Sequence, residues 1–206
     1  MSAPRRLTVV FIALAIACLS CGAPADLRDV ATDAEFGDRM PAHIRSDAVA
    51  ASNALNLLHT GLVPAEISQL SLAIARESER VGLPVDLVLA VIRVESSGYN
   101  FALSQAGAMG LMQLLPSTAV SVAQRIGVRW VGPSTLFDPV SNVRLGINYL
   151  QQLVERYGSV PTALAAYNWG PGRIAERIRR GESIPVAYAQ RVMGLYGGTK
   201  ASPLEI

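Results

Sequence analysis

The residues with the most distinctive chemistry are a lone glutamate and those of a glycine-containing turn that follows it. Glu95 opens the segment Glu95-Ser-Ser-Gly98, and Gly107-Ala-Met-Gly-Leu-Met-Gln113 follows shortly after. No Asp or Glu occurs between Ser96 and Phe137. A glycosidase protonates the leaving oxygen with a carboxyl group of raised pKa, and a neighbouring carboxylate usually completes its site. Because that neighbour is missing locally, the sequence favours cleavage of a glycosidic bond by a single acid/base, with the substrate supplying the internal nucleophile.

Glu95 follows a predicted helix that starts at Pro84, a residue favoured in the first turn. Residues 85–94 are apolar nearly all round except for Asp86 and Arg93, so the helix is expected in the centre of the domain. Glu95 then lies at the C-terminal end of a buried helix. Desolvation and the negative end of the helix dipole both disfavour the ionised carboxylate there. The sequence therefore predicts a raised pKa for Glu95.

Two further segments carry groups that suit a sugar polymer. Gly107 and Gly110 allow a chain to approach the backbone closely, and Gln113 offers both hydrogen-bond donors and an acceptor. Tyr167 and its neighbours Asn168 and Trp169 place rings and an amide at a helix end, where they suit stacking on sugar faces and bonding to acetamido groups. The spacing of both segments also fits ordinary core packing and helix capping.

Other kinds of site find little support. His43 and His59 are the only histidines, and neither has cysteine or carboxylate neighbours at metal-ligand spacing. A Ser-His-acid triad is excluded for a core that lacks histidine, and no phosphate-binding glycine loop is present. We therefore expect no metal and no cofactor.

The first 25 residues are typical of a secretory signal peptide. Arg5 and Arg6 precede an apolar run over residues 9–19, about half the length of the roughly 20 residues that a membrane-spanning helix needs. Small residues follow, and they allow two kinds of processing: ordinary cleavage after Ala23-Pro-Ala25, or lipid attachment at Cys21. The sequence thus predicts export to the periplasm or cell envelope, and membrane anchoring through a lipidated Cys21 stays open.

Cysteine and charge usage narrow the class of protein further. Both cysteines, Cys18 and Cys21, lie in the leader, so the mature chain has no disulfide. Arg5 and Arg6 are two of the 18 basic residues, whereas all 16 acidic residues follow the leader, which leaves residues 26–206 with a net charge of zero. Binding to nucleic acid is not indicated.

The rest of the chain reads as an arm followed by one helical domain. Residues 26–64 are interpreted as an N-terminal arm or linker, loosely docked, with a short amphipathic helix around residues 47–58. Residues 65–200 show apolar spacing of three to four residues between Gly, Pro and Asp breaks, and no two-residue alternation. Helices are predicted over residues 64–82, 84–94, 116–126, 140–157, 160–168, 172–180 and 185–196. A compact all-α domain is the expected architecture.

Four blocks in this order resemble the soluble lytic transglycosylases, whose catalytic domain is goose-lysozyme-like. The blocks are Glu95-Ser-Ser-Gly98, Gly107-Ala-Met-Gly-Leu-Met-Gln113, Asn142-Val-Arg-Leu-Gly-Ile-Asn-Tyr149 and Ala165-Ala-Tyr-Asn-Trp-Gly-Pro-Gly-Arg173. The resemblance spans about residues 66–196 and implies a lysozyme-like helical fold. It also implies that Glu95 is the catalytic acid and then the base.

By the same resemblance, six residues line the substrate cleft. They are Ser104, Met112, Gln113, Tyr167, Asn168 and Tyr188. Tyr188 rests on a shortened motif, Pro185-Val-Ala-Tyr188. Phe101 and Gln105 stand where the family often has proline, which predicts a reshaped loop.

The implied activity is non-hydrolytic cleavage of peptidoglycan between N-acetylmuramic acid and N-acetylglucosamine, leaving 1,6-anhydro ends. One alternative is a hydrolytic lysozyme, which needs a general base such as Asp138 or Glu182; another is a non-catalytic wall-binding module. The expected partner is the glycan strand, and the expected state is a monomer. The sequence does not distinguish general wall turnover from service to a secretion or conjugation machinery.

Overall fold

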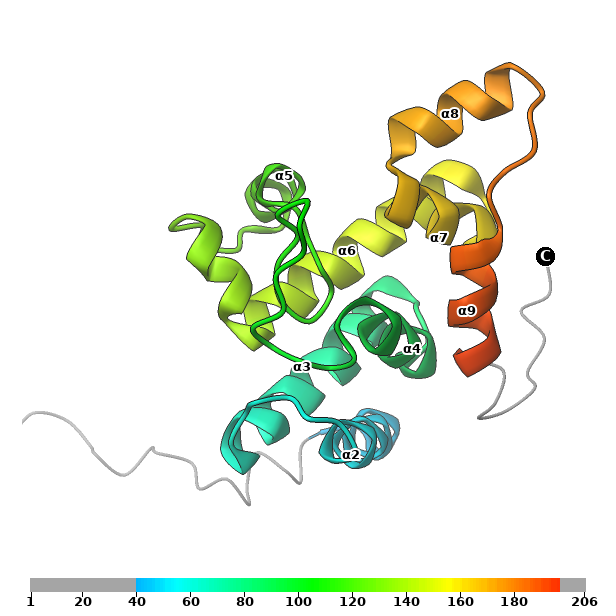
Figure 1. Ribbon diagram of the computed structural model, residues 1–206. Helices are drawn as coiled ribbons and strands as arrows, with labels where there is room; N and C mark the ends of the chain where they lie inside the picture. The colour runs from blue at the N-terminus through cyan, green and yellow to red at the C-terminus, as the bar shows by residue number, and fades with distance from the viewer. Residues whose placement is uncertain (1–39, 197–206) are drawn as a thin grey trace, which may run out of the picture. The chain divides into compact units, whose positions relative to one another are not determined.

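The computed structural model describes residues 40–196, which form eight α-helices and one 3₁₀-helix, with no β-strand among them (Figure 1). The helices are α2 (Ala42–Asn56), α3 (Pro64–Val81), α4 (Val85–Ser96), α5 (Pro116–Ile126), η1 (Pro133–Phe137), α6 (Pro139–Tyr157), α7 (Val160–Trp169), α8 (Pro171–Arg179) and α9 (Ala187–Tyr196). The all-α prediction is confirmed. The predicted signal peptide (residues 1–25) and residues 26–39 and 197–200 lie outside the described residues.

Local sequence signals explain where the helices begin and end. The carboxylate of Asp138 accepts a 2.7 Å hydrogen bond from the Ser141 amide and so caps the start of α6. The same helix ends at Gly158, whose φ of 65° lies in the left-handed region that glycine adopts without strain. Such caps allow the predicted helix boundaries to agree closely with those of the structure.

Helix α4 lies at the centre of the largest core cluster, as its sequence predicts. Leu87, Val88, Val91 and Ile92 are fully buried, and α4 packs against α2, α3 and α9 (Figure 1). Burying a side chain of this size stabilises the fold by roughly 1.5–3 kcal/mol. The position of Glu95 near the end of α4 is therefore set by a firmly packed helix.

The expected boundary at residue 64 differs from the structure. Helix α2 packs closely on α3, and its residues Ala51 and Leu55 are fully buried in the main core. The short amphipathic helix expected around residues 47–58 overlaps α2, but with Ala51 and Leu55 as its buried residues the apolar stripe is too weak to predict that the helix docks on the domain. Residues 42–63 are thus part of the domain and do not form a loosely docked arm.

Helix α6 connects the parts of the domain. It contributes Val143, Ile147 and Leu150 to the main core, Leu145 to the cluster around α5, and Leu153 to the cluster around α7 and α8. In Figure 1 it runs as a long diagonal between α5 and α7. Between residues 40 and 196, no helix combines the length and apolar character needed to cross a membrane.

Candidate active site

The site is organised around a hydrogen bond between α4 and α9. Glu95 is the next-to-last residue of α4, and its Oε1 accepts a 2.5 Å hydrogen bond from the Tyr188 hydroxyl near the start of α9. Tyr188 is only 3% exposed, whereas Glu95 is partly buried. The packing of α9 on α4 thus brings together the predicted acid and a tyrosine that lies 93 positions later.

Burial raises the pKa of Glu95 above its usual value of 4.5. The Tyr188 hydrogen bond and the positive charge of Arg191 act in the opposite direction, but desolvation is the larger effect. The predicted raised pKa therefore agrees with the structure, with burial as its main cause. A carboxyl group in this environment keeps its proton to a higher pH. Once it is ionised, it still accepts the hydrogen bond from the Tyr188 hydroxyl.

Tyr188 and Tyr167 both remain protonated near this carboxyl group. Burial and the charge of Glu95 raise the pKa of each tyrosine well above its usual value of 10.0. The Arg191 guanidinium lies 5.8 Å from the centre of the Tyr188 ring, within cation–π range. Both tyrosines can therefore act as hydrogen-bond donors and not as bases.

Tyr167 is anchored at both ends. Its hydroxyl donates a 2.8 Å hydrogen bond to the Met112 carbonyl, and its ring packs against Tyr149 with 5.3 Å between ring centres. Its neighbours at the end of α7, Asn168 and Trp169, are exposed to solvent. The structure thus fixes Tyr167 beside Glu95 and leaves the next two side chains accessible.

The Leu111–Met112 backbone holds three helices together. Ser96, next to Glu95, donates a 2.8 Å hydrogen bond to the Leu111 carbonyl. The Met112 amide donates at 2.8 Å to Oδ1 of Asn142 on α6, and the Met112 carbonyl accepts from Tyr167 on α7. The segment therefore fixes α4, α6 and α7 relative to one another at the site.

Gln113 and Ser104 shape the loop over residues 102–113. Gln113 has a φ of 48°, and its Nε2 donates to the carbonyls of Ala102 at 3.1 Å and Gly110 at 3.0 Å. The Ser104 hydroxyl accepts a 2.9 Å hydrogen bond from the Ala108 amide. Both side chains are partly exposed, so each can hold the loop and still reach solvent.

Met112 was expected to line the cleft, and the structure corrects this expectation for its side chain. The side chain is fully buried, and a Cβ added at Gly146 would lie 2.4 Å from its Sδ. Since it packs against the backbone of α6, it has no face toward a substrate. Its part in the site is to hold the backbone that bonds Tyr167.

Sequence reasoning did not assign a role to Asn142. This side chain is fully buried, accepts from the Met112 amide, and donates to the carbonyls of Met109 at 3.0 Å and Leu136 at 2.9 Å. The sequence pointed to Asn142 only through its place in a motif in the first turn of α6. Its hydrogen-bond partners in the loop could not be predicted, because they lie about 30 positions earlier in the chain. Arg191 was also missed, although it follows Tyr188 by one helical turn.

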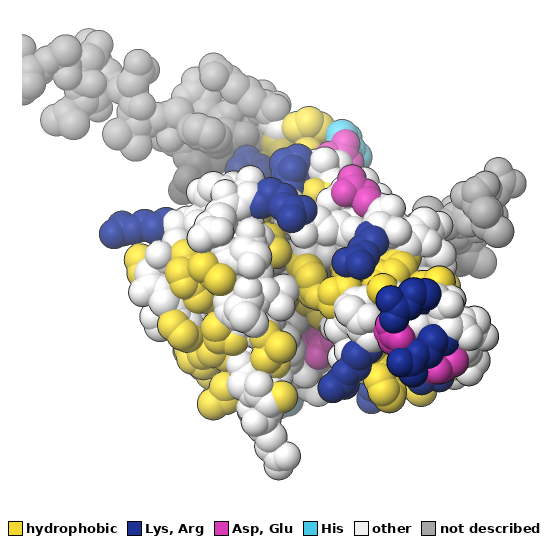
Figure 2. All heavy atoms as spheres, turned by 90° about the horizontal axis from the view of Figure 1, so that it is seen from above, with side chains coloured by type: hydrophobic (Ala, Val, Ile, Leu, Met, Phe, Trp, Pro, Cys, Tyr) yellow, Lys and Arg dark blue, Asp and Glu magenta, His cyan; other side chains and the backbone are white. Residues whose placement is uncertain are grey.

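The two carboxylates considered as a general base are engaged elsewhere. Asp138 caps α6, and Glu182 pairs with Arg177 at 3.3 Å and Arg180 at 3.8 Å. Figure 2 shows basic and acidic side chains gathered together over α8. Within residues 40–196, no group of His, Cys, Asp and Glu is arranged to hold a metal ion.

The family model described as "Transglycosylase SLT domain" matches residues 72–185, more than half of the chain. The fold, the helix-end glutamate and this match define the class: the chain belongs to the transglycosylase SLT domain family, as its sequence blocks suggested.

Individual relatives agree with this class. The transglycosylase of Enterobacteria phage PRD1 is 38% identical over 128 residues, which cover 55% of this chain and 45% of that protein. The soluble lytic murein transglycosylase of Escherichia coli K12 is 35% identical over 94 residues, covering 45% and 15% respectively. The membrane-bound lytic murein transglycosylase C of Mannheimia succiniciproducens is 37% identical over 111 residues, covering 49% and 31%. The matched region is thus less than half of each of these relatives.

Solved structures share the fold. An inactive Glu-to-Gln mutant of the lytic transglycosylase Slt from Pseudomonas aeruginosa superimposes with a TM-score of 0.56 at 25% identity, covering 75% of this chain and 30% of that one. The 70 kDa soluble lytic transglycosylase of Escherichia coli gives a TM-score of 0.51 at 24% identity, covering 75% and 28%, which shows likeness of fold alone. The lysozyme-like helical architecture is therefore confirmed.

Proposed function

We propose that this chain is a peptidoglycan lytic transglycosylase in which Glu95 acts as acid and then as base. The observation that carries the proposal is the environment of Glu95: a largely buried carboxyl group held by Tyr188. Tyr188 and Arg191 are the groups that act on its pKa besides burial, and no second carboxylate is among them in the described part of the chain. The names of the soluble and membrane-bound murein transglycosylases among its relatives support the same substrate.

The mechanism needs one carboxyl group in two protonation states. Protonated Glu95 donates its proton to the oxygen between N-acetylmuramic acid and N-acetylglucosamine, and the C1–O bond breaks. The acetamido carbonyl of the muramic acid stabilises the positive C1. Ionised Glu95, still hydrogen-bonded by Tyr188, then takes the proton of the C6 hydroxyl, whose oxygen closes on C1. This step forms the 1,6-anhydro ring and restores the protonated acid.

The contacts made by Asp138 and Glu182, the two candidates for a general base, support this chemistry over hydrolysis. A hydrolytic enzyme of this kind places a second carboxylate where it can hold and activate a water molecule. Asp138 is engaged in capping α6, and Glu182 in two ion pairs near the end of α8. The C6 hydroxyl of the sugar is therefore the nucleophile that competes best at C1.

The products of wall digestion test the proposal. Purified peptidoglycan digested by the full chain should release muropeptides that end in 1,6-anhydro-N-acetylmuramic acid. In mass spectra these are lighter by one water than hydrolysed fragments, and they resist borohydride because they have no reducing end. Mainly reducing ends would contradict the transglycosylase assignment even if Glu95 is the acid.

We further propose that the protein acts outside the cytoplasm. The support is the charged and apolar leader over residues 1–25, and the name of a membrane-bound relative fits an envelope location. Labelling with a fatty-acid analogue distinguishes the two kinds of processing. Label that is incorporated by the wild type and lost in Cys21→Ser would show lipid anchoring, whereas an unlabelled chain beginning at Asp26 would show ordinary cleavage.

A further inference from the structure

The chain that leaves α2 runs against the turn that follows Glu95. Residues 57–61, here called the 57–61 segment, follow α2, and residues 97–101, the 97–101 turn, follow α4. The Asn100 amide in the turn donates a 3.0 Å hydrogen bond to the Thr60 carbonyl in the segment. Both of these residues are almost fully buried. Two stretches that are far apart in the sequence are therefore joined immediately after the candidate acid.

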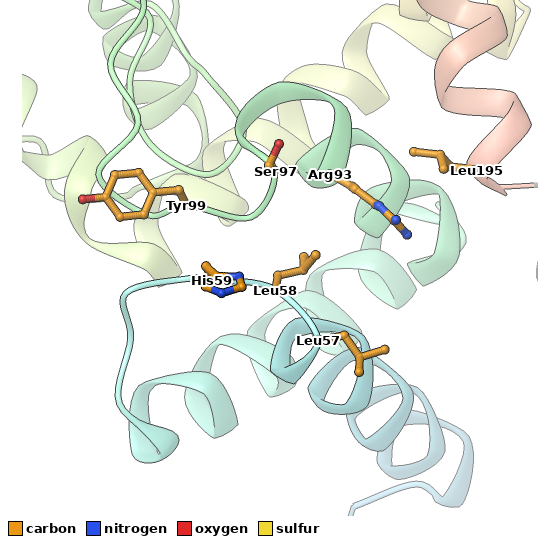
Figure 3. A pocket seen from close by; sticks show the side chains of 7 residues that line it. All are labelled: Leu57, Leu58, His59, Arg93, Ser97, Tyr99 and Leu195. Carbon is orange, nitrogen blue, oxygen red and sulfur yellow. The ribbon is translucent and has the colours of Figure 1, made fainter.

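Two glycines allow the segment and the turn to touch. Gly98 has a φ of 84°, and a Cβ added to it would lie 2.7 Å from Leu58 Cδ1 and 2.9 Å from Leu58 Cβ. A Cβ at Gly61 would lie 3.3 Å from the Tyr99 ring. Figure 3 shows Leu58 on the segment, facing the turn that carries Ser97 and Tyr99. A larger residue at position 98 would have to displace Leu58 or the turn.

Gly98 is linked to the candidate active site through Ser96. The Gly98 amide donates at 3.1 Å to Ser96 Oγ, and Ser96 Oγ donates at 2.8 Å to the Leu111 carbonyl. Ser96 follows Glu95 directly, and Leu111 belongs to the backbone that fixes α4, α6 and α7 relative to one another. A displacement of Gly98 therefore reaches both the end of α4 and the loop that faces it.

The 97–101 turn is held from another side by η1. The Asn100 side chain donates at 2.9 Å to the Phe137 carbonyl, and the Phe101 ring lies 5.9 Å from the Phe137 ring. Residues 97–101 belong to no helix, so the position of the turn depends on the elements that contact it. The 57–61 segment and η1 thus hold the turn between them.

We infer that the 57–61 segment positions Glu95 for catalysis, with Leu58 and Gly98 as the positioning residues. The inference rests on the proposed function, and both residues act through Ser96. The family match covers residues 72–185, so it contains the turn and η1 but not the segment that supports them. The catalytic rate of this chain therefore depends on residues outside the region that defines its family.

The kinetic test changes the contact between Leu58 and Gly98 from both sides. Gly98→Ala places a Cβ against Leu58 and should lower kcat on purified peptidoglycan by about tenfold to 10²-fold, as expected when a catalytic group is misplaced by up to about 1 Å. KM should change little, because Glu95 acts on the transition state. Adding Leu58→Ala makes room for the new Cβ and should recover most of the lost kcat. Leu58→Ala alone leaves a gap and should cause a smaller loss.

Two matched controls separate positioning from backbone strain and from general damage to the segment. Gly82→Ala, at the end of α3, has a similar φ of 72°, but its Cβ would meet no atom within 4 Å. Leu57→Ala removes the neighbouring leucine, which is 84% exposed. Both controls should keep the wild-type kcat at a temperature where circular dichroism shows every variant to be folded.

Two kinetic results would overturn the inference. One is a kcat for Gly98→Ala equal to that of Gly82→Ala, and the other is a loss that Leu58→Ala does not relieve. If Gly98→Ala does not fold, the comparison of Leu58→Ala with Leu57→Ala decides, and equal kcat values in these two variants would overturn the role of Leu58.

An NMR measurement that needs no cleavage separates this inference from the proposed function. In protein with ¹³C-labelled glutamate carboxyl groups, the signal that is lost in Glu95→Gln belongs to Glu95. This signal should move in Gly98→Ala, return when Leu58→Ala is added, and stay in place in Gly82→Ala. A wild-type chain that shows this pattern but does not cleave peptidoglycan would overturn the proposed function and retain the positioning of Glu95. An unmoved Glu95 signal in Gly98→Ala would overturn the positioning role, whatever the activity.

Discussion

The Tyr188 hydroxyl donates a hydrogen bond to Glu95 Oε1 at 2.5 Å, a distance typical of a hydroxyl bonded to a carboxylate. Tyr188 cannot serve as a base, since burial and the charge of Glu95 raise its pKa far above the physiological range. The bond therefore favours the ionised form of Glu95, whereas burial favours the protonated form. This opposition suits a group that must give up a proton and then take one back.

The first prediction concerns the pH dependence of Tyr188→Phe. The hydrogen bond lowers the pKa of Glu95, so its removal raises that pKa further. Because the first step needs protonated Glu95, the alkaline limb of the pH–rate profile should move to higher pH. The maximal kcat should fall about tenfold, since the carboxylate loses a hydrogen bond to a charged group. The measurement is kcat against pH on purified peptidoglycan.

Tyr157→Phe is the matched control for this prediction. The Tyr157 hydroxyl donates a partly buried hydrogen bond to the Pro171 carbonyl at 2.7 Å, so this variant also loses one hydrogen bond of a tyrosine hydroxyl. It should lower stability and leave the alkaline limb where it is in the wild type. An unshifted limb in Tyr188→Phe would mean that the tyrosine acts only in packing.

The second prediction is that Glu95→Gln abolishes most catalysis without unfolding the domain. The amide has nearly the same shape but cannot donate the proton, so the rate should fall by at least about 10²-fold, as expected for the loss of a general acid. Release of soluble fragments from peptidoglycan measures the rate, and circular dichroism checks the helices. Glu155→Gln, at an exposed glutamate of α6, is the control and should keep full activity. A rate in Glu95→Gln equal to that of the control would remove Glu95 from the mechanism.

The sequence was sufficient to predict the α-helices from α3 onward and the place of Glu95, but not the 3₁₀-helix η1. The reason is that these elements carry local signals: apolar spacing, proline at helix starts and glycine at helix ends. The raised pKa of Glu95 also followed from one local fact, the apolar helix before it. A helix was also expected around residues 47–58, where α2 lies, but its docking was not, because this depends on Ala51 and Leu55 meeting surfaces of α3 and α4 that are distant in the chain.

Contacts between distant side chains could not be predicted in this way. Met112 was placed in the cleft because the neighbouring Gln113 belongs there by resemblance, but its side chain points into the core against Gly146. The bonds of Asn142 to the loop likewise depend on how α6 lies beneath residues 109–112. Periodicity identifies which face of a helix is buried, and not which polar atom meets which backbone group.

The third prediction uses two glycines that lie within helices. A Cβ at Gly146 would lie 2.4 Å from Met112 Sδ and 2.8 Å from Met112 Cβ, so Gly146→Ala must displace Met112. Overpacking of this kind destabilises a core by about 1–3 kcal/mol. A Cβ at Gly194 on α9 would meet no atom within 4 Å, so Gly194→Ala should instead stabilise by about 0.5–1 kcal/mol through helix propensity. Urea denaturation of the two variants should therefore give opposite signs, and a stable Gly146→Ala would show that Met112 is loosely packed.

The last prediction assigns Asn142 the task of holding the loop that supports Tyr167. Its carboxamide makes three hydrogen bonds to the backbone: one from the Met112 amide and two to the carbonyls of Met109 and Leu136. Asn142→Ala removes all three bonds and leaves the Met112 amide and the Leu136 carbonyl without them, whereas the Met109 carbonyl keeps its bond from the Leu114 amide. Each net hydrogen bond contributes about 1 kcal/mol, so stability should fall by about 3 kcal/mol.

Asn142→Asp separates stability from positioning. The carboxylate still accepts from the Met112 amide but loses both donors and places negative oxygens against two carbonyls. It should therefore unfold at least as easily as Asn142→Ala in urea, although it is closer in shape to asparagine. At a temperature where both variants remain folded, kcat should fall more than KM rises, because the Met112 carbonyl that anchors the Tyr167 hydroxyl is displaced near Glu95. A variant that loses stability but keeps the wild-type kcat when folded would show that Asn142 supports the fold alone, and that Tyr167 is held by its packing on Tyr149.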